Sequence, residues 1–474
     1  MSERESENGA LPASEPVADE ESYSLKEKIV EAVSDALAAE DPQRVKQILE
    51  TLHYSDVADL VERLALEDRD ALLDIIKRDF DPEILHELDE ELRDDIAKKL
   101  GLSNVAAAVS ELDSDDAVSV VEELADNEQK QLLAAMPAED RAVIRDALAY
   151  PEDSAGRLMQ RELVEVPPDW TVGETIDFMR RTADDEFEDL PEVFYDIFVV
   201  SGDGKPLGAI PLSRLLRSRR QMPVADIMGT KMQLVPATMD QEEVAFLFRQ
   251  RDLVSAPVVD EAGRLVGAIT VDDVVDVIQE ENEEDFLRLG GVAGSDLHAP
   301  PVETAWRRSH WLLVTLINNI IAATVISQFE ATIEQIVALA VLMPMVAAMG
   351  GNAGTQVVTV VIRGLATKEL SPGNILRVAV KEIGVAIVNG IGFAVIAGLL
   401  AAFWFENAAL GAVLAGALVF NMVWAGLAGT VIPMALVRFR IDPTIAAGPI
   451  LTTTTDVLGF FCFLGLATRF LLGG

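Results

Sequence analysis

One carboxylate lies inside the apolar C-terminal part of the chain. Asp456 follows four consecutive threonines, Thr452 to Thr455, near the middle of a long hydrophobic run. An acidic side chain at the centre of a membrane costs at least about 2.5–3.5 kcal/mol, so it is expected to face a cavity or a partner. Because no Lys or Arg lies nearby in the sequence to neutralise it, a bound cation is the expected partner. A protonated acid that joins helices by hydrogen bonds is the alternative.

A run of small and polar residues interrupts another hydrophobic segment. It contains Gly350, Gly351, Asn352 and Gly354, followed by Gln356. Glycines at membrane depth allow the backbone to unwind where it lines water, or allow helices to pack very closely. Carboxylate, amide, hydroxyl and carbonyl oxygens together suit a mostly hydrated Mg²⁺. The two polar features therefore indicate a pathway for a hard divalent cation.

The charge of the chain is divided sharply along its length. Residues 302–474 hold 8 acidic and 9 basic residues, whereas residues 1–301 hold 71 acidic and 29 basic residues, a formal charge of −42. This excess of negative charge argues against nucleic acid as a partner, because phosphate binding needs a basic face. It favours cation binding, or a solubility or salt adaptation. Residues 1–22 are polar and lack the features of a signal peptide, so we expect a disordered tail and a cytosolic soluble part.

Five hydrophobic runs each reach the roughly 20 residues that cross a bilayer. The connections that follow the second and fourth runs are basic, and those that follow the first and third carry Glu residues and no base. Because basic loops stay on the cytosolic side, the alternation predicts a cytosolic N-terminus and an external C-terminus. The expected spans are 309–329, 333–362, 375–404, 408–437 and 444–471.

Residues 156–280 contain an internal repeat with a β-α-β-β-α order in each copy. The strand-like runs Ile197–Val200 and Ala256–Val259 are each followed by a Gly-containing turn. This region resembles tandem CBS domains, which commonly bind adenosyl nucleotides or act as regulatory dimerisation modules. Residues 23–155 show only helical periodicity and predict a small superhelix of short helices.

The segment that follows the repeat is strongly acidic. Asp273, Asp276, Glu280 and Glu284 would share one face of a helix. Like charges four residues apart repel each other, so cations that bridge this face to another acidic face would stabilise it.

Together these features resemble the MgtE family of Mg²⁺ channels over nearly the whole chain after about residue 25. The motifs are Tyr150–Met159 before the repeat, Gly350–Gln356, Arg363–Thr367 and Asp456–Gly459. The resemblance implies a multidomain fold: an all-α superhelical N-terminal domain, an α/β tandem CBS pair and an α-helical transmembrane domain of five helices. The implied boundaries are a tail 1–22, an N-terminal domain 23–155, CBS domains 156–217 and 218–272, a plug or connecting helix 273–300 and a pore domain 301–474.

The resemblance also implies roles for particular residues. A homodimer would line one pore, where Asp456 and Asn352 hold a hydrated Mg²⁺ and where Gly350, Gly351, Gly354 and Thr455 form the lining. A plug helix would span roughly residues 273–292. Regulatory Mg²⁺ would bind Asp240, Glu242, Asp252, Asp273, Asp276, Glu281, Glu284 and Asp285. In the N-terminal domain, the expected ligands are Asp113, Asp115 and Asp116.

The expected function is Mg²⁺ uptake across a bacterial plasma membrane through a non-enzymatic pore that cytosolic Mg²⁺ closes. ATP or another adenosyl nucleotide is a further expected ligand at the CBS pair. Three alternatives stay open: transport of Co²⁺, Mn²⁺ or Zn²⁺, a membrane-anchored nucleotide sensor, and an intramembrane aspartyl hydrolase in which two Asp456 residues form a dyad.

Overall fold

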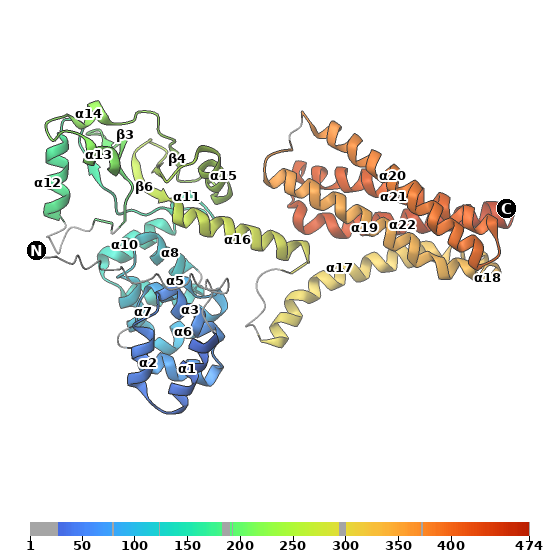
Figure 1. The fold of residues 1–474 in the computed structure, drawn as a ribbon, viewed down its shortest axis with the longest axis horizontal. Helices are drawn as coiled ribbons and strands as arrows, with labels where there is room; N and C mark the ends of the chain where they lie inside the picture. The colour runs from blue at the N-terminus through green and yellow to red at the C-terminus, as the bar shows by residue number, and fades with distance from the viewer. Residues whose placement is uncertain are drawn as a thin grey trace, which may run out of the picture. The chain divides into compact units, whose positions relative to one another are not determined.

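The computed structural model divides into two compact units, Met1–Val277 and Ile278–Gly474. Each unit is described by itself (Figure 1). The tail expected at residues 1–22 lies outside the described part. The structure describes residues 27–77, 80–122, 124–182, 190–191, 193–292, 300–370 and 373–473.

The first unit begins with a stack of short amphipathic helices. Their ends follow local signals: Asp41 accepts a hydrogen bond from the Arg44 N–H at 3.0 Å, and Pro42 occupies the first turn of α2. The helices are α1 (Glu27–Ala38), α2 (Pro42–Leu49), α3 (Tyr54–Arg63), α4 (Leu66–Ile76), α5 (Glu83–Glu87), α6 (Glu90–Leu100), α7 (Leu102–Val109), α8 (Ser114–Glu122), α9 (Asp126–Ala135) and α10 (Ala138–Ala147).

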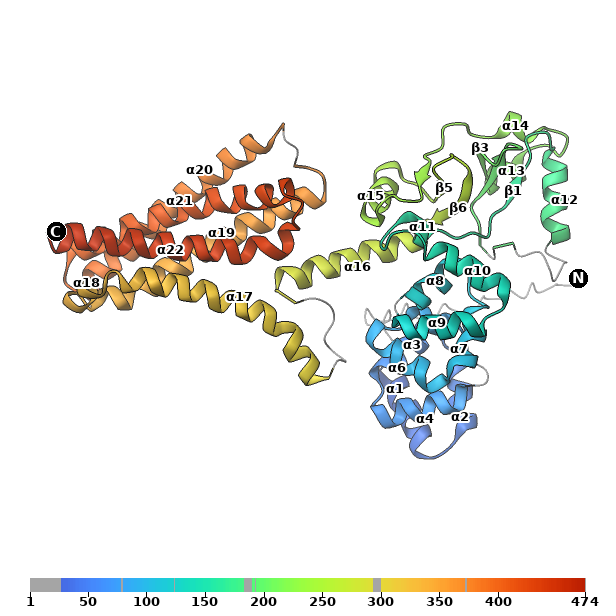
Figure 2. The ribbon, with the colours of Figure 1, turned by 180° about the vertical axis from the view of Figure 1, so that it is seen from behind.

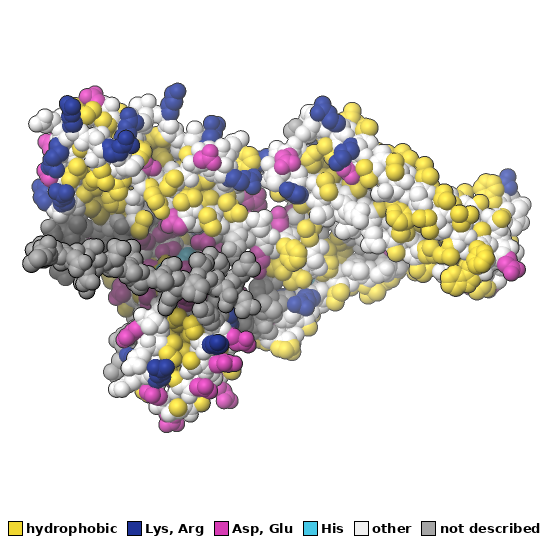
Figure 3. Space-filling view, in the orientation of Figure 1, with side chains coloured by type: hydrophobic (Ala, Val, Ile, Leu, Met, Phe, Trp, Pro, Cys, Tyr) yellow, Lys and Arg dark blue, Asp and Glu magenta, His cyan; other side chains and the backbone are white. Residues whose placement is uncertain are grey.

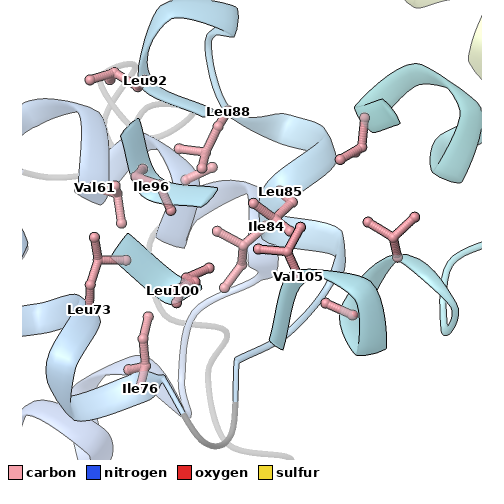
Figure 4. Close-up of a cluster of buried hydrophobic side chains, with 14 of the residues drawn as sticks. Val61, Leu73, Ile76, Ile84, Leu85, Leu88, Leu92, Ile96, Leu100 and Val105 are labelled. Carbon is pink, nitrogen blue, oxygen red and sulfur yellow. The ribbon is translucent and has the colours of Figure 1, made fainter. Parts of the chain in front are cut away.

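The core of this stack is continuous from helix to helix. Val61 of α3, Leu73 of α4, Leu85 of α5 and Ile96 of α6 are buried, and Figure 4 shows them pointing toward one another. Burying such a side chain contributes about 1.5–3 kcal/mol relative to exposure. Each helix packs mainly on helices close to it in sequence, so the predicted superhelical stack is confirmed.

The repeat follows as two small sheets with the same topology. In each, a short parallel strand pairs with the middle strand, which pairs antiparallel with the third. The turns between the paired strands use Gly204 (φ +79°) and Gly263 (φ +77°), where a left-handed backbone favours glycine. The elements are α11 (Ala155–Leu158), β1 (Glu165–Val166), α12 (Val172–Thr182), β2 (Asp196–Val200), β3 (Pro206–Pro211), α13 (Leu212–Arg217), α14 (Val224–Ile227), β4 (Val235–Pro236), α15 (Gln241–Arg251), β5 (Ser255–Val259) and β6 (Leu265–Thr270).

The two repeats cover each other's sheet edges. Gln160, which precedes the first sheet, exchanges two backbone hydrogen bonds with Ala268 of β6. Gly229, which precedes the second sheet, exchanges two with Ala209 of β3. Because an open sheet edge invites further pairing, this exchange closes the edges and ties the repeats into one body.

The helix after β6 and the membrane part complete the chain. α16 (Val271–Leu289) is close to the expected 273–292. The first long helix begins eight residues before its expected start, and the second begins at Ala338 because residues 330–335 form a separate short helix. The elements of this part are α17 (Pro301–Ser327), α18 (Glu330–Gln335), α19 (Ala338–Ala366), α20 (Ile375–Trp404), α21 (Ala408–Arg438) and α22 (Pro443–Leu471).

Five of these helices, α17 and α19–α22, are long and apolar enough to cross a membrane. Large hydrophobic side chains such as Leu312, Val388, Phe403 and Phe461 are exposed on them. Figure 3 shows hydrophobic side chains over most of the visible face of this unit, with charged side chains gathered toward its ends. Such a surface needs lipid as its solvent, so the chain is an integral membrane protein.

Candidate ion pathway and acidic clusters

Glycines bring α19, α21 and α22 into close contact. α19 is a continuous helix across Gly350 and Gly351, so the run does not unwind. Gly350 and Gly354 allow close packing, whereas a Cβ at Gly351 would meet open space. A Cβ added to Gly354 would come within 2.7 Å of the Leu451 side chain on α22. The amide of Asn421 on α21 fills the space beside Gly350 of α19 and Gly459 of α22.

These contacts set the register between α19 and α22. Gly354 faces Leu451, and Gly350 and Gly459 meet at the same amide. Asn352 lies between the two contact points on α19, and Asp456 lies between them on α22. The structure therefore brings the two expected ion ligands to one depth. Asn352 is exposed and Asp456 half-buried in the single chain, so both reach a surface that this chain does not fully cover.

The threonines before Asp456 use their hydroxyl groups within the helix. Thr452 donates to the Gly448 carbonyl at 3.0 Å and Thr453 to the Pro449 carbonyl at 2.7 Å. Thr455 is fully buried, and its hydroxyl lies within hydrogen-bond distance of the Leu451 and Thr452 carbonyls. The structure thus buries Thr455, whereas Asn352 is exposed and Asp456 is half-buried. A lining role for Thr455 stays a prediction.

A cluster of carboxylates lies in the first unit, where α5 and α8 come close to the start of α16. The charges of Asp113, Asp272 and Asp276 act on Asp116, and the charge of Asp273 acts on Asp115. We call this group the α8–α16 cluster; its members are Asp81, Glu83, Glu87, Asp113, Asp115, Asp116, Asp272, Asp273 and Asp276.

Burial and mutual repulsion make these groups hard to ionise. Burial is the largest cause that raises the pKa of Asp116, Asp273 and Glu83 to about 7. Burial followed by the charge of Asp273 raises the pKa of Asp115 well above its usual value. His86 Nε2 lies 3.4 Å from Asp116 Oδ1, but burial and then Arg93 lower the pKa of His86, so its neutral form is favoured. A bound cation would offset the remaining repulsion.

Hydrogen bonds join the helical stack to the segment that precedes the first sheet, beside this cluster. Gln160 Nε2 donates to Asp113 Oδ2 at 2.7 Å, and Ser114 Oγ donates to Glu162 Oε2 at 2.7 Å. Thr270 Oγ1 donates to Asp273 Oδ2 at 2.7 Å. Among the residues that the structure describes, no three His, Cys, Asp or Glu side chains converge on a point that could hold a metal ion.

A second acidic group lies in the other unit, where the end of α16 meets the start of α22. Asp442 caps α22 by accepting from the Thr444 N–H at 2.8 Å, and its other oxygen lies 3.3 Å from Arg288 Nη1. Arg288 also pairs with Glu284. Burial, then the charges of Asp442 and Glu281, raise the pKa of Asp285.

The remaining predicted regulatory residues are not brought together within the chain. Asp240 caps the start of α15 by accepting from the Glu242 N–H at 3.0 Å, whereas Asp252 ends the helix with a φ of +51°. A helix rises about 1.5 Å per residue, so the two aspartates are about 18 Å apart. All three side chains are exposed. Their role in metal binding stays a prediction.

The two sheets also frame a shallow recess that is open to solvent. Its lining includes the aromatic side chains of Phe194 and Tyr195 and the polar side chains of Asp196, Ser255 and Thr270. Ser255 Oγ donates to Asp196 Oδ2 at 2.5 Å, which links β5 to β2.

Comparison with known proteins identifies the family. Residues 52–153 match the profile of the MgtE intracellular N domain, residues 155–220 and 224–280 match CBS domains, and residues 343–466 match the divalent cation transporter domain MgtE. A magnesium transporter MgtE of Bacillus subtilis is 32% identical over 90% of this chain and 94% of its own length. One of Thermus thermophilus is 33% identical over 94% and 98%. The chain belongs to the MgtE family.

The family is one of magnesium transporters, so the chain is not an enzyme and the hydrolase alternative falls. Among solved structures, the cytosolic domain of the Mg²⁺ channel MgtE in complex with ATP is 33% identical. It covers 52% of this chain and 99% of its own length, with a TM-score of 0.48.

Sequence reasoning missed several members of these sites in this MgtE-family chain. Asp442 has a visible signal, because an Asp before Pro443 marks a helix start, but its pairing with Arg288 spans 154 residues. Glu83 and Glu87 are four residues apart on α5, which indicates a shared face and nothing about the facing helix. Asp272 lies in an acidic run, and its residue type alone does not show which other helix it faces.

We expect the α8–α16 cluster to make the protein less stable as pH rises in the absence of divalent ions. A carboxyl group whose pKa is raised in the folded protein does not destabilise the fold at pH values below its pKa in the unfolded chain, about 4. Above that pH it destabilises the fold increasingly, up to about pH 7. With a chelator present, thermal unfolding of the full-length protein in detergent should occur at a lower temperature at about pH 7.5 than at about pH 5.5. Asp116→Asn should shrink this difference, and Asp35→Asn, an exposed change in α1, should not. Equal differences in the two variants would contradict the assignment.

Proposed function

We propose that this MgtE-family chain forms a Mg²⁺-selective channel, with the pore between two copies of the chain. The observation that carries the proposal is the common depth of Asn352 and Asp456, which the contacts of Gly350, Gly354 and Gly459 set. An amide oxygen and a carboxylate at one level can bind the water shell of Mg²⁺, which gives up its waters reluctantly. A second copy would double this set around a central axis.

The partly uncovered position of both residues supports a pore at a dimer interface. A carboxylate that faced lipid would be costly, so the surface that carries Asp456 needs a partner chain or water. We infer that α19 and α22 of two copies enclose the pathway. The basic residues around Arg363, Lys381 and Arg438 support a cytosolic position for that end of the helices, with the N-terminus inside a bacterial plasma membrane and the C-terminus outside.

Removing the Asp456 carboxylate should strongly reduce Mg²⁺ entry or its selectivity. In proteoliposomes, Asp456→Ala is expected to lower the rate of Mg²⁺ entry by about tenfold or more, since a charge-assisted contact contributes about 1.5–3 kcal/mol. Glu334→Gln, which changes an exposed acid in α18, is the matched control and should conduct as the intact protein does. If the intact protein admits Co²⁺, Mn²⁺ or Zn²⁺ but not Mg²⁺, the transported ion is that metal and not Mg²⁺. Wild-type flux in Asp456→Ala would refute the site.

We further propose that cytosolic Mg²⁺ closes the channel through the two acidic groups at the ends of α16. At low Mg²⁺, repulsion among Asp116, Asp272 and Asp273 opposes the contact between α8 and α16. Hydrated Mg²⁺ between these carboxylates would remove the repulsion and favour the contact. At the other end of the same helix, Glu281, Asp285 and Asp442 form a second acidic group beside the first turn of α22.

The proposed closure needs Mg²⁺ to bind one arrangement of α16 more tightly than the other. Asp442 caps α22, the helix that carries Asp456, so ions at Asp285 and Asp442 would act on the start of the pore helix. Several weak sites that act together would give a steep response to the ion concentration.

Neutralising the α8–α16 cluster should leave a channel that conducts but closes poorly. For Asp116→Asn combined with Asp273→Asn, the Mg²⁺ concentration that halves flux is expected to rise about tenfold, with flux at low Mg²⁺ retained. Flux should be measured with Mg²⁺ varied on the face that carries the first unit. Asp35→Asn is the control. Unchanged inhibition in the double variant would place the sensor elsewhere.

An adenosyl nucleotide is the second proposed ligand. The recess between the sheets combines the aromatic rings of Phe194 and Tyr195, which could stack on a base, with Asp196 and Thr270, which could bind ribose hydroxyls. Its described lining contains no Lys or Arg, so base and ribose rather than phosphates would supply recognition.

Binding of ATP and of AMP to the full-length protein should weaken about tenfold in Asp196→Ala, because the hydrogen bonds to ribose would be lost. Asp226→Ala, an exposed change in α14, should bind as the intact protein does. Isothermal titration gives both affinities. No binding of either nucleotide to the intact protein would refute this ligand.

A further inference from the structure

Asn421 is a polar residue in the interior of the membrane part. It is not among the residues expected to bind the ion in the pore. It lies on α21 and is 0% exposed. α21 packs against α19, α20 and α22, and Figures 1 and 2 both show it running beside them. A polar side chain at such a place is costly unless a specific contact compensates for its burial.

The amide of Asn421 makes one hydrogen bond to the backbone of α19. Its Nδ2 donates to the Val346 carbonyl at 2.9 Å. This contact fixes the orientation of the amide, because a carbonyl can only accept. The Asn421 Oδ1 is buried and has no hydrogen-bond partner in the described part of the chain. The side chain is therefore held by one directional bond and by its fit.

Two glycines on different helices make room for that amide. A Cβ at Gly350 of α19 would overlap the Asn421 Nδ2, and a Cβ at Gly459 of α22 would lie 2.7 Å from it. Neither helix could approach α21 this closely with any larger residue. Gly465, on the same helix as Gly459, has nothing within 4 Å of its Cβ position, so such close contact is not general along α22.

Both glycines are close in sequence to the expected ion ligands. Gly350 precedes Asn352 by two residues and Gly459 follows Asp456 by three, which correspond to about 3 Å and about 4.5 Å along the helix axes. A shift of either helix against Asn421 would move an ion ligand by a similar amount. The amide thus bonds to the α19 segment and packs against the α22 segment, although it lies in the interior between helices.

We propose that Asn421 is a positioning residue for ion selection, which holds α19 and α22 in the register that places Asn352 and Asp456 at one depth. This inference rests on the proposed pore. Without the hydrogen bond to Val346, α19 can slide or rotate against α21. The ligand spacing then becomes less defined, and the site discriminates less well between the water shells of Mg²⁺ and of the larger Ca²⁺.

The test measures selectivity rather than the amount of transport. Asn421→Leu keeps the branched shape and the number of heavy atoms of the side chain and removes the donor. In proteoliposomes, it is expected to lower the ratio of Mg²⁺ to Ca²⁺ entry by about fivefold, the factor of one lost neutral hydrogen bond. Gel filtration should show folded protein in normal amount. Gly465→Ala is the control and should keep the wild-type ratio.

A paired substitution tests the fit independently of the leucine variant. Gly350→Ala should abolish flux because the new methyl group overlaps the amide. Adding Asn421→Ala should restore part of the flux because it removes that overlap. The ratio of Mg²⁺ to Ca²⁺ entry in this double variant should be lower than in the intact protein. If Asn421→Leu fails to fold, this pair of variants tests the positioning role of Asn421 in its place.

A wild-type ratio in folded Asn421→Leu, or a double variant no better than Gly350→Ala, would overturn the positioning role. If the intact protein conducts and Asp456→Ala impairs it, the proposed pore survives that result. An intact protein that moves neither ion would overturn the proposed pore and this inference together.

Discussion

The placement of carboxylates away from bulk water is the constraint on which the rest of this molecule depends. Asp116 and Asp273 meet in the first unit, Asp285 and Asp442 meet in the second, and Asp456 lies inside a membrane helix. Each arrangement opposes folding unless a proton or a cation compensates for the charge. A protein whose cargo is a divalent cation can use that cation as the compensating charge, and the closure proposed above depends on this compensation.

Helix α16 joins the two acidic settings by covalent continuity. Its first turn belongs to the α8–α16 cluster, and its last turn carries Arg288, which pairs with Asp442 at the start of α22. In the membrane part, glycine contacts take the place of a hydrophobic driving force, because lipid tails are as apolar as the helices themselves. Close backbone approach and the single amide of Asn421 set the register of α19 and α22, the helices that carry Asn352 and Asp456.

Sequence reasoning was strongest where the signal is local. The strand runs at 196–200 and 255–259, the helical stack before them and five long apolar helices all follow from periodicity and hydropathy. It was weaker at element ends. The first membrane helix begins at Pro301 rather than at the expected residue 309, because its first turns are amphipathic and lack the hydropathy by which a span is recognised. The sequence left unwinding at Gly350 open, and the continuous helix α19 excludes it. The space left by the missing side chain of Gly350 is filled by the amide of Asn421.

The sequence by itself determined the class of protein, the elements and the positions of the carboxylates along the chain, because residue type and spacing act over a few residues. Only the tertiary structure decided which of these carboxylates meet, since Asp116 and Asp272 belong to different domains of the first unit. It alone revealed Arg288 against Asp442, 154 residues apart, and Asn421 against Val346, 75 residues apart. Such contacts depend on how helices pack in three dimensions, and no local pattern in the chain encodes that geometry.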